Sequence, residues 1–236
     1  MTTLPYSQLQ PKIQPLDLIL FQGADFVSQT LLRKELKTPN NFSHVGLVVT
    51  SDILPDVKAL IPGRLYVWES TIANSLPGLQ IRDLEEVITA YTATPGVKVA
   101  WGHLQKNPWR LTASKQALIE TMKGHYDKYT QKIRDAQPTT CCWCRPKNLL
   151  SPLDIQGHTL LTSHKQTNWL HHPELSALIY HGFGILPVEK DPQDFTPVDF
   201  IAGKSPVIDS ILYIKPDMPI SMSGQFTTKT QKKAPK

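Results

Sequence analysis

The chain has 236 residues, of which 40% are hydrophobic and 19% are charged, a composition typical of a soluble globular protein. This composition excludes disorder throughout the chain. No apolar run approaches the ~20 residues that a helix needs to cross a bilayer, and the nearest run, residues 16–21, contains Asp17. The sequence opens without a basic region followed by an apolar stretch, so we expect no secretory signal peptide.

The formal net charge of +5 lies mainly at the end of the chain. The last eight residues contain Lys229, Lys232, Lys233 and Lys236. From about Ser221 onward the sequence is polar and poor in large apolar side chains, so residues 221–236 are predicted to form a flexible basic tail. We interpret the tail as a solubilising end, with weak contact to an acidic surface or to nucleic acid as the alternative. Since no aromatic stripe is interleaved with Arg or Lys, specific nucleic-acid binding is not expected.

The three cysteines are clustered at Cys141, Cys142 and Cys144. An odd, clustered set makes a poor disulfide framework and favours a reducing environment. Cys141 and Cys144 have the spacing of a zinc or redox pair, but no second pair follows to complete a four-ligand site. We therefore interpret them as thiols in or near a loop.

Hydrophobic periodicity predicts the secondary structure in chain order. Apolar or β-branched runs bounded by turn formers predict strands at residues 16–21, 44–50, 65–69, 97–101 and 209–214. Amphipathic spacing, with Thr112 as a cap and Pro173 in a first turn, predicts helices at residues 26–36, 83–90, 112–123, 126–134 and 173–180. Residues 76–78, Leu-Pro-Gly, and residues 135–168 are predicted to be loops.

These elements predict an α+β fold with a small antiparallel sheet packed against helices. The sequence has no internal repeat, so we expect one domain over residues 13–220. Residues 1–12 are expected to be an N-terminal extension, and residues 221–236 form the tail.

Three segments in this order match one family pattern: residues 15–21 (Pro-Leu-Asp-Leu-Ile-Leu-Phe), 42–49 (Phe-Ser-His-Val-Gly-Leu-Val-Val) and 67–70 (Val-Trp-Glu-Ser). They resemble the circularly permuted NlpC-like papain-fold hydrolases, a group that includes YiiX-type amidase-like proteins, poxvirus virion proteins and, more distantly, lecithin retinol acyltransferase. The similarity continues at residues 124–127, 174–187 and 195–200. It covers about residues 13–214, with 128–168 unmatched, and implies a permuted papain-like fold.

The resemblance implies three site residues. His44 stands at the place of the catalytic histidine, and Glu69 at the place of the polar residue that orients it. His172 stands where the family has its nucleophilic cysteine, at the start of a helix. An imidazole lacks the nucleophilicity of a thiolate activated by a nearby histidine and a helix N-terminus, so a covalent acyl-enzyme is not expected.

Two interpretations of function stay open. The first is a degenerate hydrolase homologue, a pseudoenzyme that acts as a binding or structural protein, with a virion component as the analogy from the family. The second is an active amidase, thioesterase or acyltransferase that uses a displaced cysteine or a metal-bound water. His44, Glu69 and His172 would be the zinc ligands in the metal alternative; otherwise no cofactor is expected.

Partners and location follow from the same resemblance. Protein partners are expected, and a lipid or acyl ligand is the further candidate. The expected location is the cytoplasm or a virion.

Overall fold

The computed structural model describes residues 2–23, 42–73, 76–135, 172–187, 189–201 and 208–217, and for 71–73, 76–78, 131–135 and 172 it describes the backbone only. The expected helix at 26–36, the three cysteines, the expected loop after residue 135 and the expected tail lie outside the described residues.

The described residues build one mixed sheet of seven strands. These are β1 (Thr3–Pro5), β2 (Leu18–Gln22), β3 (His44–Val49), β4 (Tyr66–Ala73), β5 (Leu76–Asp83), β6 (Lys98–Leu104) and β7 (Ile208–Lys215). Their order across the sheet is β1-β7-β6-β2-β3-β4-β5, and every neighbouring pair is antiparallel except the parallel pair β1 and β7. The predicted α+β class is confirmed, but the sheet is larger than expected and is not purely antiparallel.

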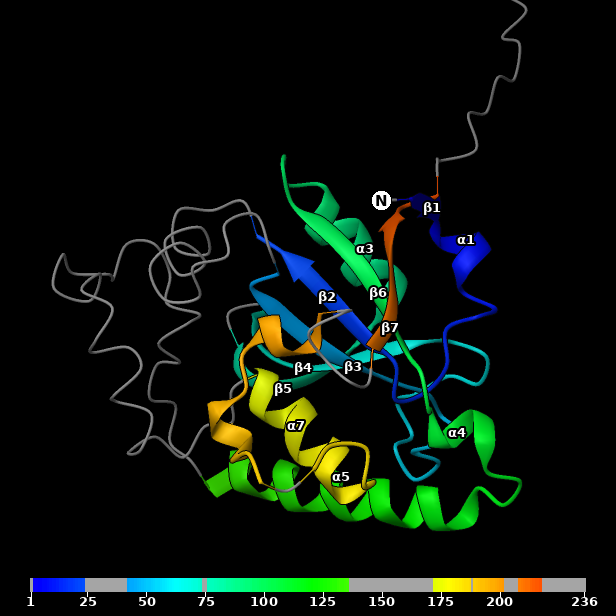
Figure 1. The fold of residues 1–236 in the computed structure, drawn as a ribbon, viewed down its shortest axis with the longest axis vertical. Coiled ribbons are helices and arrows are strands. Elements are labelled where there is room, and N and C mark those ends of the chain that lie inside the picture. The colour runs from blue at the N-terminus through cyan, green and yellow to red at the C-terminus, as the bar shows by residue number, and fades with distance from the viewer. Residues whose placement is uncertain are drawn as a thin grey trace, which may run out of the picture.

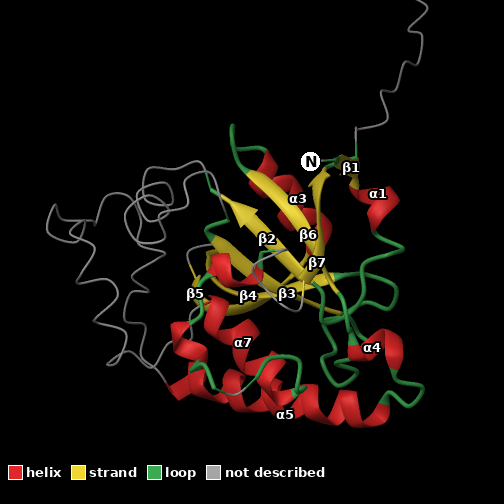
Figure 2. Ribbon diagram, viewed as in Figure 1, coloured by secondary structure: helices red, strands yellow, loops and turns green. Residues whose placement is uncertain are grey.

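Helices cover both faces of this sheet (Figures 1 and 2). The α-helices are α1 (Tyr6–Leu9), α3 (Leu84–Thr92), α4 (Pro108–Leu111), α5 (Gln116–Asp135) and α7 (His172–Gly182), and two 3₁₀ turns follow, η4 (Pro192–Asp194) and η5 (Pro197–Phe200). Helix α3 starts directly after β5 because the Asp83 side chain caps it, accepting hydrogen bonds from the backbone N–H groups of Glu85 and Glu86.

Alternating strand side chains create a separate apolar core on each face. On what we call the α7 face, strand residues such as Leu47 and Trp68 pack with Leu175 and Tyr180 of α7. On the opposite α3 face, residues 19, 21, 48 and 67 pack with residues 84, 87 and 88 of α3. The central strand β2 is buried on both faces, which explains its continuous apolar run.

Three sequence-based expectations need correction. In place of the helices expected at 112–123 and 126–134 there is one helix, α5, which begins at Gln116 and runs through Gly124 without a break. Thr112, the expected N-terminal cap, instead ends α4. A single glycine lowers helix stability but does not end a helix. The expected loop at Leu-Pro-Gly 76–78 is the beginning of strand β5, which lies at the edge of the sheet, where a proline is tolerated.

The start of the chain is the third correction. Residues 1–12 were expected to precede the domain, but β1 pairs with β7 in the main sheet. Tyr6 and Leu9 of α1 are buried in the α3-face core. Residue 13 is therefore not an edge of the folded unit.

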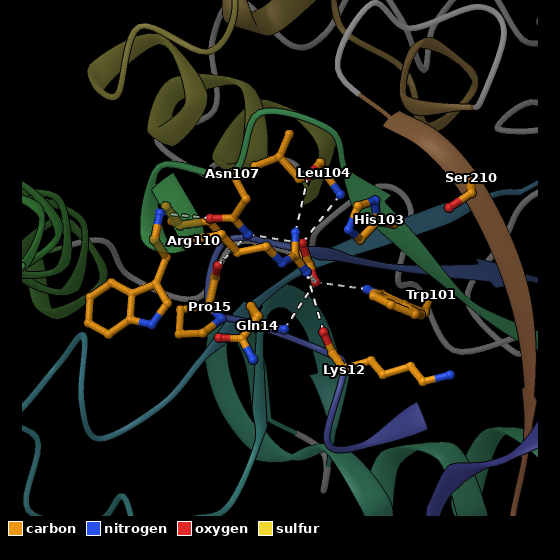
Figure 3. A network of polar contacts seen from close by, with 12 residues as sticks. Lys12, Gln14, Pro15, Trp101, His103, Leu104, Asn107, Arg110 and Ser210 are labelled. Atoms are coloured by element: carbon orange, nitrogen blue, oxygen red, sulfur yellow. Dashed lines mark hydrogen bonds and ion pairs between the residues drawn. The ribbon is translucent and has the colours of Figure 1, made fainter. Parts of the chain in front are cut away.

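The buried carboxylate of Asp17 forms a polar hub that joins the start of β2 to the end of β6 and to α4. Figure 3 labels its partners Trp101, Asn107 and Arg110. The carboxylate accepts hydrogen bonds from backbone N–H groups of Gln14 and Leu104 and from side chains of Trp101, Asn107 and Arg110. The shortest of these contacts is 2.6 Å, from a terminal nitrogen of Arg110. The role of Asp17 was not predicted from the sequence, because four of its five donors lie more than eighty residues away along the chain.

The residue before the hub has an unusual backbone conformation. Leu16 has φ 73°, in the left-handed region that non-glycine residues rarely adopt. Its backbone N–H donates to the carbonyl of Val48, and its carbonyl accepts a 2.7 Å hydrogen bond from the hydroxyl of Tyr180 in α7. These two bonds fix the turn and tie α7 to the start of β2.

Candidate functional site

Strands β3 and β4 bring His44 and Glu69 together. The strands pair antiparallel, with Leu47 opposite Trp68 and Val48 opposite Val67. Continuing this register sets position 46 opposite Glu69. His44 lies two residues before position 46 in β3, so its side chain is on the same face of the sheet as that of Glu69. Nε2 of His44 lies 2.5 Å from Oε2 of Glu69. The structure thus pairs the two residues that the resemblance named as histidine and acid, while their catalytic role stays a prediction.

Gly46 provides the space for this pairing. A Cβ at position 46 would overlap with Cγ2 of Val67 and would lie 3.2 Å from the Cβ of Glu69. Any larger residue would therefore push β4 away or displace the Glu69 side chain.

Arg82 of β5 is a third member of the site, and sequence analysis missed it. The β4–β5 register sets Arg82 opposite Val67, so its side chain lies on the same face as Glu69. Its Nε donates to Oε1 of Glu69 at 2.9 Å, and a terminal nitrogen donates to the same oxygen. The expected loop at 76–78 hid the strand that carries Arg82; the strand period through residues 79–82 was the signal that could have revealed it.

The carboxylate of Glu69 is the buried centre of this group. Its side chain is 0% exposed, against 14% for His44 and 22% for Arg82. Burial alone would raise the pKa of Glu69, but the hydrogen bonds and positive charges of His44 and Arg82 outweigh it and hold that pKa below its ordinary value. Glu69 is therefore ionised at neutral pH.

Aromatic side chains of the α3 face line the same site. The ring centroids of Phe21 and His44 lie 5.0 Å apart, and those of Phe21 and Tyr91 lie 4.5 Å apart. The guanidinium of Arg82 lies over the Tyr91 ring at 5.8 Å. The pair of His44 and Glu69 is thus enclosed by β2, β5 and α3.

His172 is the first residue of α7, and its side chain lies outside the described residues. The body of α7 packs on the α7 face through Leu175 and Tyr180, whereas His44 and Glu69 point to the α3 face. The expectation that His44, Glu69 and His172 surround one cleft stays a prediction. Cys141, Cys142 and Cys144 also lie outside the described residues.

The metal alternative stays untested for the same reason. Within the described part of the chain, no three His, Cys, Asp or Glu side chains are placed to hold a metal ion together. The expected zinc triad includes His172, whose side chain lies outside that part.

Chemically, the three described side chains provide a base held by a carboxylate. Such a carboxylate fixes the ring orientation of an imidazole and stabilises its protonated form. The nucleophile for any covalent step would have to come from another part of the chain.

Comparison with protein-family models matched none to this chain, and comparison with curated proteins found none similar to it. No helix in the described ranges is both long enough and apolar enough to cross a membrane.

Proposed function

We propose that this protein is a degenerate papain-like hydrolase homologue that works as a binding or structural protein. Two features support the proposal. His44 and Glu69 are paired as the family pattern requires, while position 172 carries a histidine in place of the nucleophilic cysteine. In this proposal, the pair is what remains of a hydrolase site that lacks the thiol at the expected position.

The observation that carries the proposal is the sharing of Glu69 between Arg82 and His44. In a cysteine hydrolase the acid stabilises the imidazolium that forms when the histidine takes the proton of the nucleophile. Here a permanently charged guanidinium already neutralises that carboxylate. The carboxylate of Glu69 in β4 thereby joins His44 of β3 to Arg82 of β5, an arrangement that favours a structural role for the three residues.

The partners in this proposal are proteins, and the analogy with virion proteins makes a particle component the working model. A lipid or acyl ligand in the ancestral cleft is the second class of partner.

One contact favours the alternative function, an active amidase, thioesterase or acyltransferase. At 2.5 Å, Nε2 of His44 is held by Glu69 in one orientation, as a working general base would be. This alternative requires a nucleophile from Cys141, Cys142 or Cys144, or a metal-bound water.

Activity measurements on the full chain separate the two functions. The proposal expects no hydrolysis of amide or thioester model substrates at neutral pH. It also expects that any labelling by a thiol-reactive acyl probe is the same in the wild type and in His44→Ala. The variants are His44→Ala, each of the three Cys→Ser changes, and His103→Ala as a matched histidine control outside the site. Turnover that is abolished by His44→Ala and by one Cys→Ser change, but kept in His103→Ala, would overturn the proposal.

A second variant tests the ancestral placement. His172→Cys puts a thiol at the start of α7, where a helix N-terminus lowers a thiol pKa. Recovery of thiol reactivity that His44→Ala removes would support descent from a cysteine hydrolase. Thiol reactivity that His44→Ala leaves unchanged would show that a residue at position 172 does not act together with His44 and Glu69.

A further inference from the structure

The contact between α5 and the end of α7 is built around a half-buried histidine. The ring of His125 in α5 stacks on Tyr129 of the same helix at 5.8 Å and lies 6.3 Å from the ring of Phe183, just beyond α7. Its third neighbour is the backbone of Gly182, the last residue of α7. We call this contact, formed by His125, Tyr129, Gly182 and Phe183, the α5–α7 seam.

Gly182 lets the imidazole lie directly on the helix backbone. A Cβ at position 182 would overlap with Nε2 of His125, with Cε1 2.7 Å away and Cδ2 3.3 Å away. The ring fills the space that any other residue at 182 would need. Little room remains for water on that side of the ring.

No anionic group among the residues that the structure describes is found to act on His125. From α7 it meets Gly182 and Phe183, neither of which titrates. Among the described residues, the charged group that acts on it is Lys128, a cation of its own helix. The titratable side chains of α7 serve other contacts: Glu174 acts on Tyr129, and His181 packs edge-on against Phe195.

The carbonyl groups of Ile179, Tyr180 and His181, in the last turn of α7, are also occupied. A helix C-terminus normally favours a nearby cation, because its last carbonyls are unpaired. Here the turn through Gly184, with φ 65°, returns backbone N–H groups to them: Gly184 donates to His181, and Ile185 donates to Tyr180. The helix end is capped by its own chain and leaves these acceptors unavailable to an imidazolium.

We propose that the α5–α7 seam is a pH-sensitive contact that closes on neutral His125 and loosens when that ring takes up a proton. A proton on the half-buried ring would add a positive charge near that of Lys128 and would be only partly hydrated. Release of the ring into water would therefore lower both the repulsion and the cost of burying the charge. The direction of the titration agrees: burial first, and then Lys128, lowers the pKa of His125. This inference does not depend on the proposed function, since the seam lies on the α7 face and the pair of His44 and Glu69 lies on the α3 face.

The sign of the pH dependence follows from linkage. A histidine whose pKa is lower in the closed state stabilises that state above the pKa of the released ring, about 6.5, and this stability is lost as the pH falls below it. One such group changes the opening constant of the seam by up to about tenfold per pH unit.

Hydrogen–deuterium exchange of the full chain between pH 7.5 and 5.0 tests the proposal, with rates corrected for intrinsic exchange. Peptides spanning residues 118–130 and 176–186 should lose protection below about pH 6.5, while peptides of β3 keep theirs as an internal reference. His125→Phe keeps an aromatic ring without a titrating nitrogen, so its seam protection should not change with pH. His103→Gln is the matched control and should behave as the wild type does.

Gly182→Ala provides a second variant that does not require substitution of the histidine. Its methyl group displaces the ring at every pH, so its seam peptides should already exchange fast at pH 7.5, with little further change at pH 5.0. The proposal is overturned if wild-type protection at the seam is independent of pH, if the same pH dependence persists in His125→Phe, or if all peptides including β3 lose protection together.

Discussion

Two buried carboxylates, Asp17 and Glu69, each bind an arginine but differ in their other partners. Both side chains are fully buried, and each pairs with an arginine at the edge of the site, Arg110 or Arg82. The remaining donors to Asp17 are two backbone N–H groups, an indole and an amide, none of which titrates near neutral pH. The remaining partner of Glu69 is the imidazole of His44, whose ring nitrogen donates or accepts according to its tautomer.

This difference separates a carboxylate held only by fixed donors from one that is shared with an imidazole. Every donor around Asp17 has a fixed protonation state, so the hub holds β2, β6 and α4 in one arrangement (Figure 3). Around Glu69, the role of the His44 ring nitrogen depends on its tautomer, and the contacts of His44 and Arg82 lower the pKa of the carboxylate. The predictions below test this distinction, from the largest expected effect to the smallest.

Asp17→Ala should cause the largest loss of stability. It leaves Arg110 without its carboxylate and strands the buried N–H groups of Trp101 and Leu104. Removing one partner of a buried ion pair typically costs about 3–5 kcal/mol. Urea unfolding at pH 7 measures this loss as the difference in the free energy of unfolding between wild type and Asp17→Ala.

Tyr180→Phe is the matched control for the hub. It removes the single hydrogen bond to Leu16 in the neighbouring turn and should cost about 1 kcal/mol. A loss in Asp17→Ala no larger than in Tyr180→Phe would show that Asp17 is not a structural joint.

Glu69→Gln should cost less, about 2–3 kcal/mol, since Arg82 and His44 are partly exposed and can be rehydrated. The effect should also depend on pH. Because the pKa of Glu69 is lowered, its contribution is complete above its ordinary value of 4.5 and is lost as the pH falls below that value. The difference between wild type and Glu69→Gln should therefore shrink below about pH 4.5. A difference that stays constant down to pH 3 would contradict this account.

Gly46→Ala should cost about 1–3 kcal/mol, because the new methyl group overlaps with Val67 on the neighbouring strand. Gly102→Ala is the control within the same sheet: its Cβ would meet Leu20 at 3.4 Å and Ile208 at 3.6 Å, ordinary contact distances. Thermal unfolding compares the two variants. Equal losses would mean that Gly46 is not needed for the approach of β3 and β4.

The sequence predicted what short-range patterns determine. Apolar runs located β2, β3, β4, β6 and β7 within a few residues, and the motif around His44 and Glu69 identified two side chains that the sheet brings into contact. These signals work because strand period and local motif lie in neighbouring residues.

Features that depend on distant pairing could not be predicted in the same way. Arg82 meets Glu69 because β5 pairs with β4, yet Leu-Pro-Gly at the start of β5 has the composition of a turn. Asp17 meets Trp101 and Arg110 only after β6 and α4 have packed. The strand period at residues 79–82 indicates a strand but not its neighbour, so in both cases tertiary pairing decides the partner.

The smallest effect is expected at a second pair of histidine and carboxylate, which tests whether burial or distance sets the strength of such a contact. Nδ1 of His103 lies 2.6 Å from Oδ1 of Asp209, almost the same separation as in the pair of His44 and Glu69. The two side chains are, however, 28% and 37% exposed. The weak burial of Asp209 would raise its pKa, but the hydrogen bond and charge of His103 lower it.

Exposed pairs of this kind contribute about 0–1 kcal/mol and are screened by salt. A double-mutant cycle with His103→Gln and Asp209→Asn at pH 7 should therefore give a coupling energy of about 0.5 kcal/mol or less, which 0.5 M salt reduces further. The parallel cycle with His44→Gln and Glu69→Gln should give a larger coupling that salt changes little. If the two couplings are equal, contact distance and not burial controls them, and the distinction drawn for Glu69 fails.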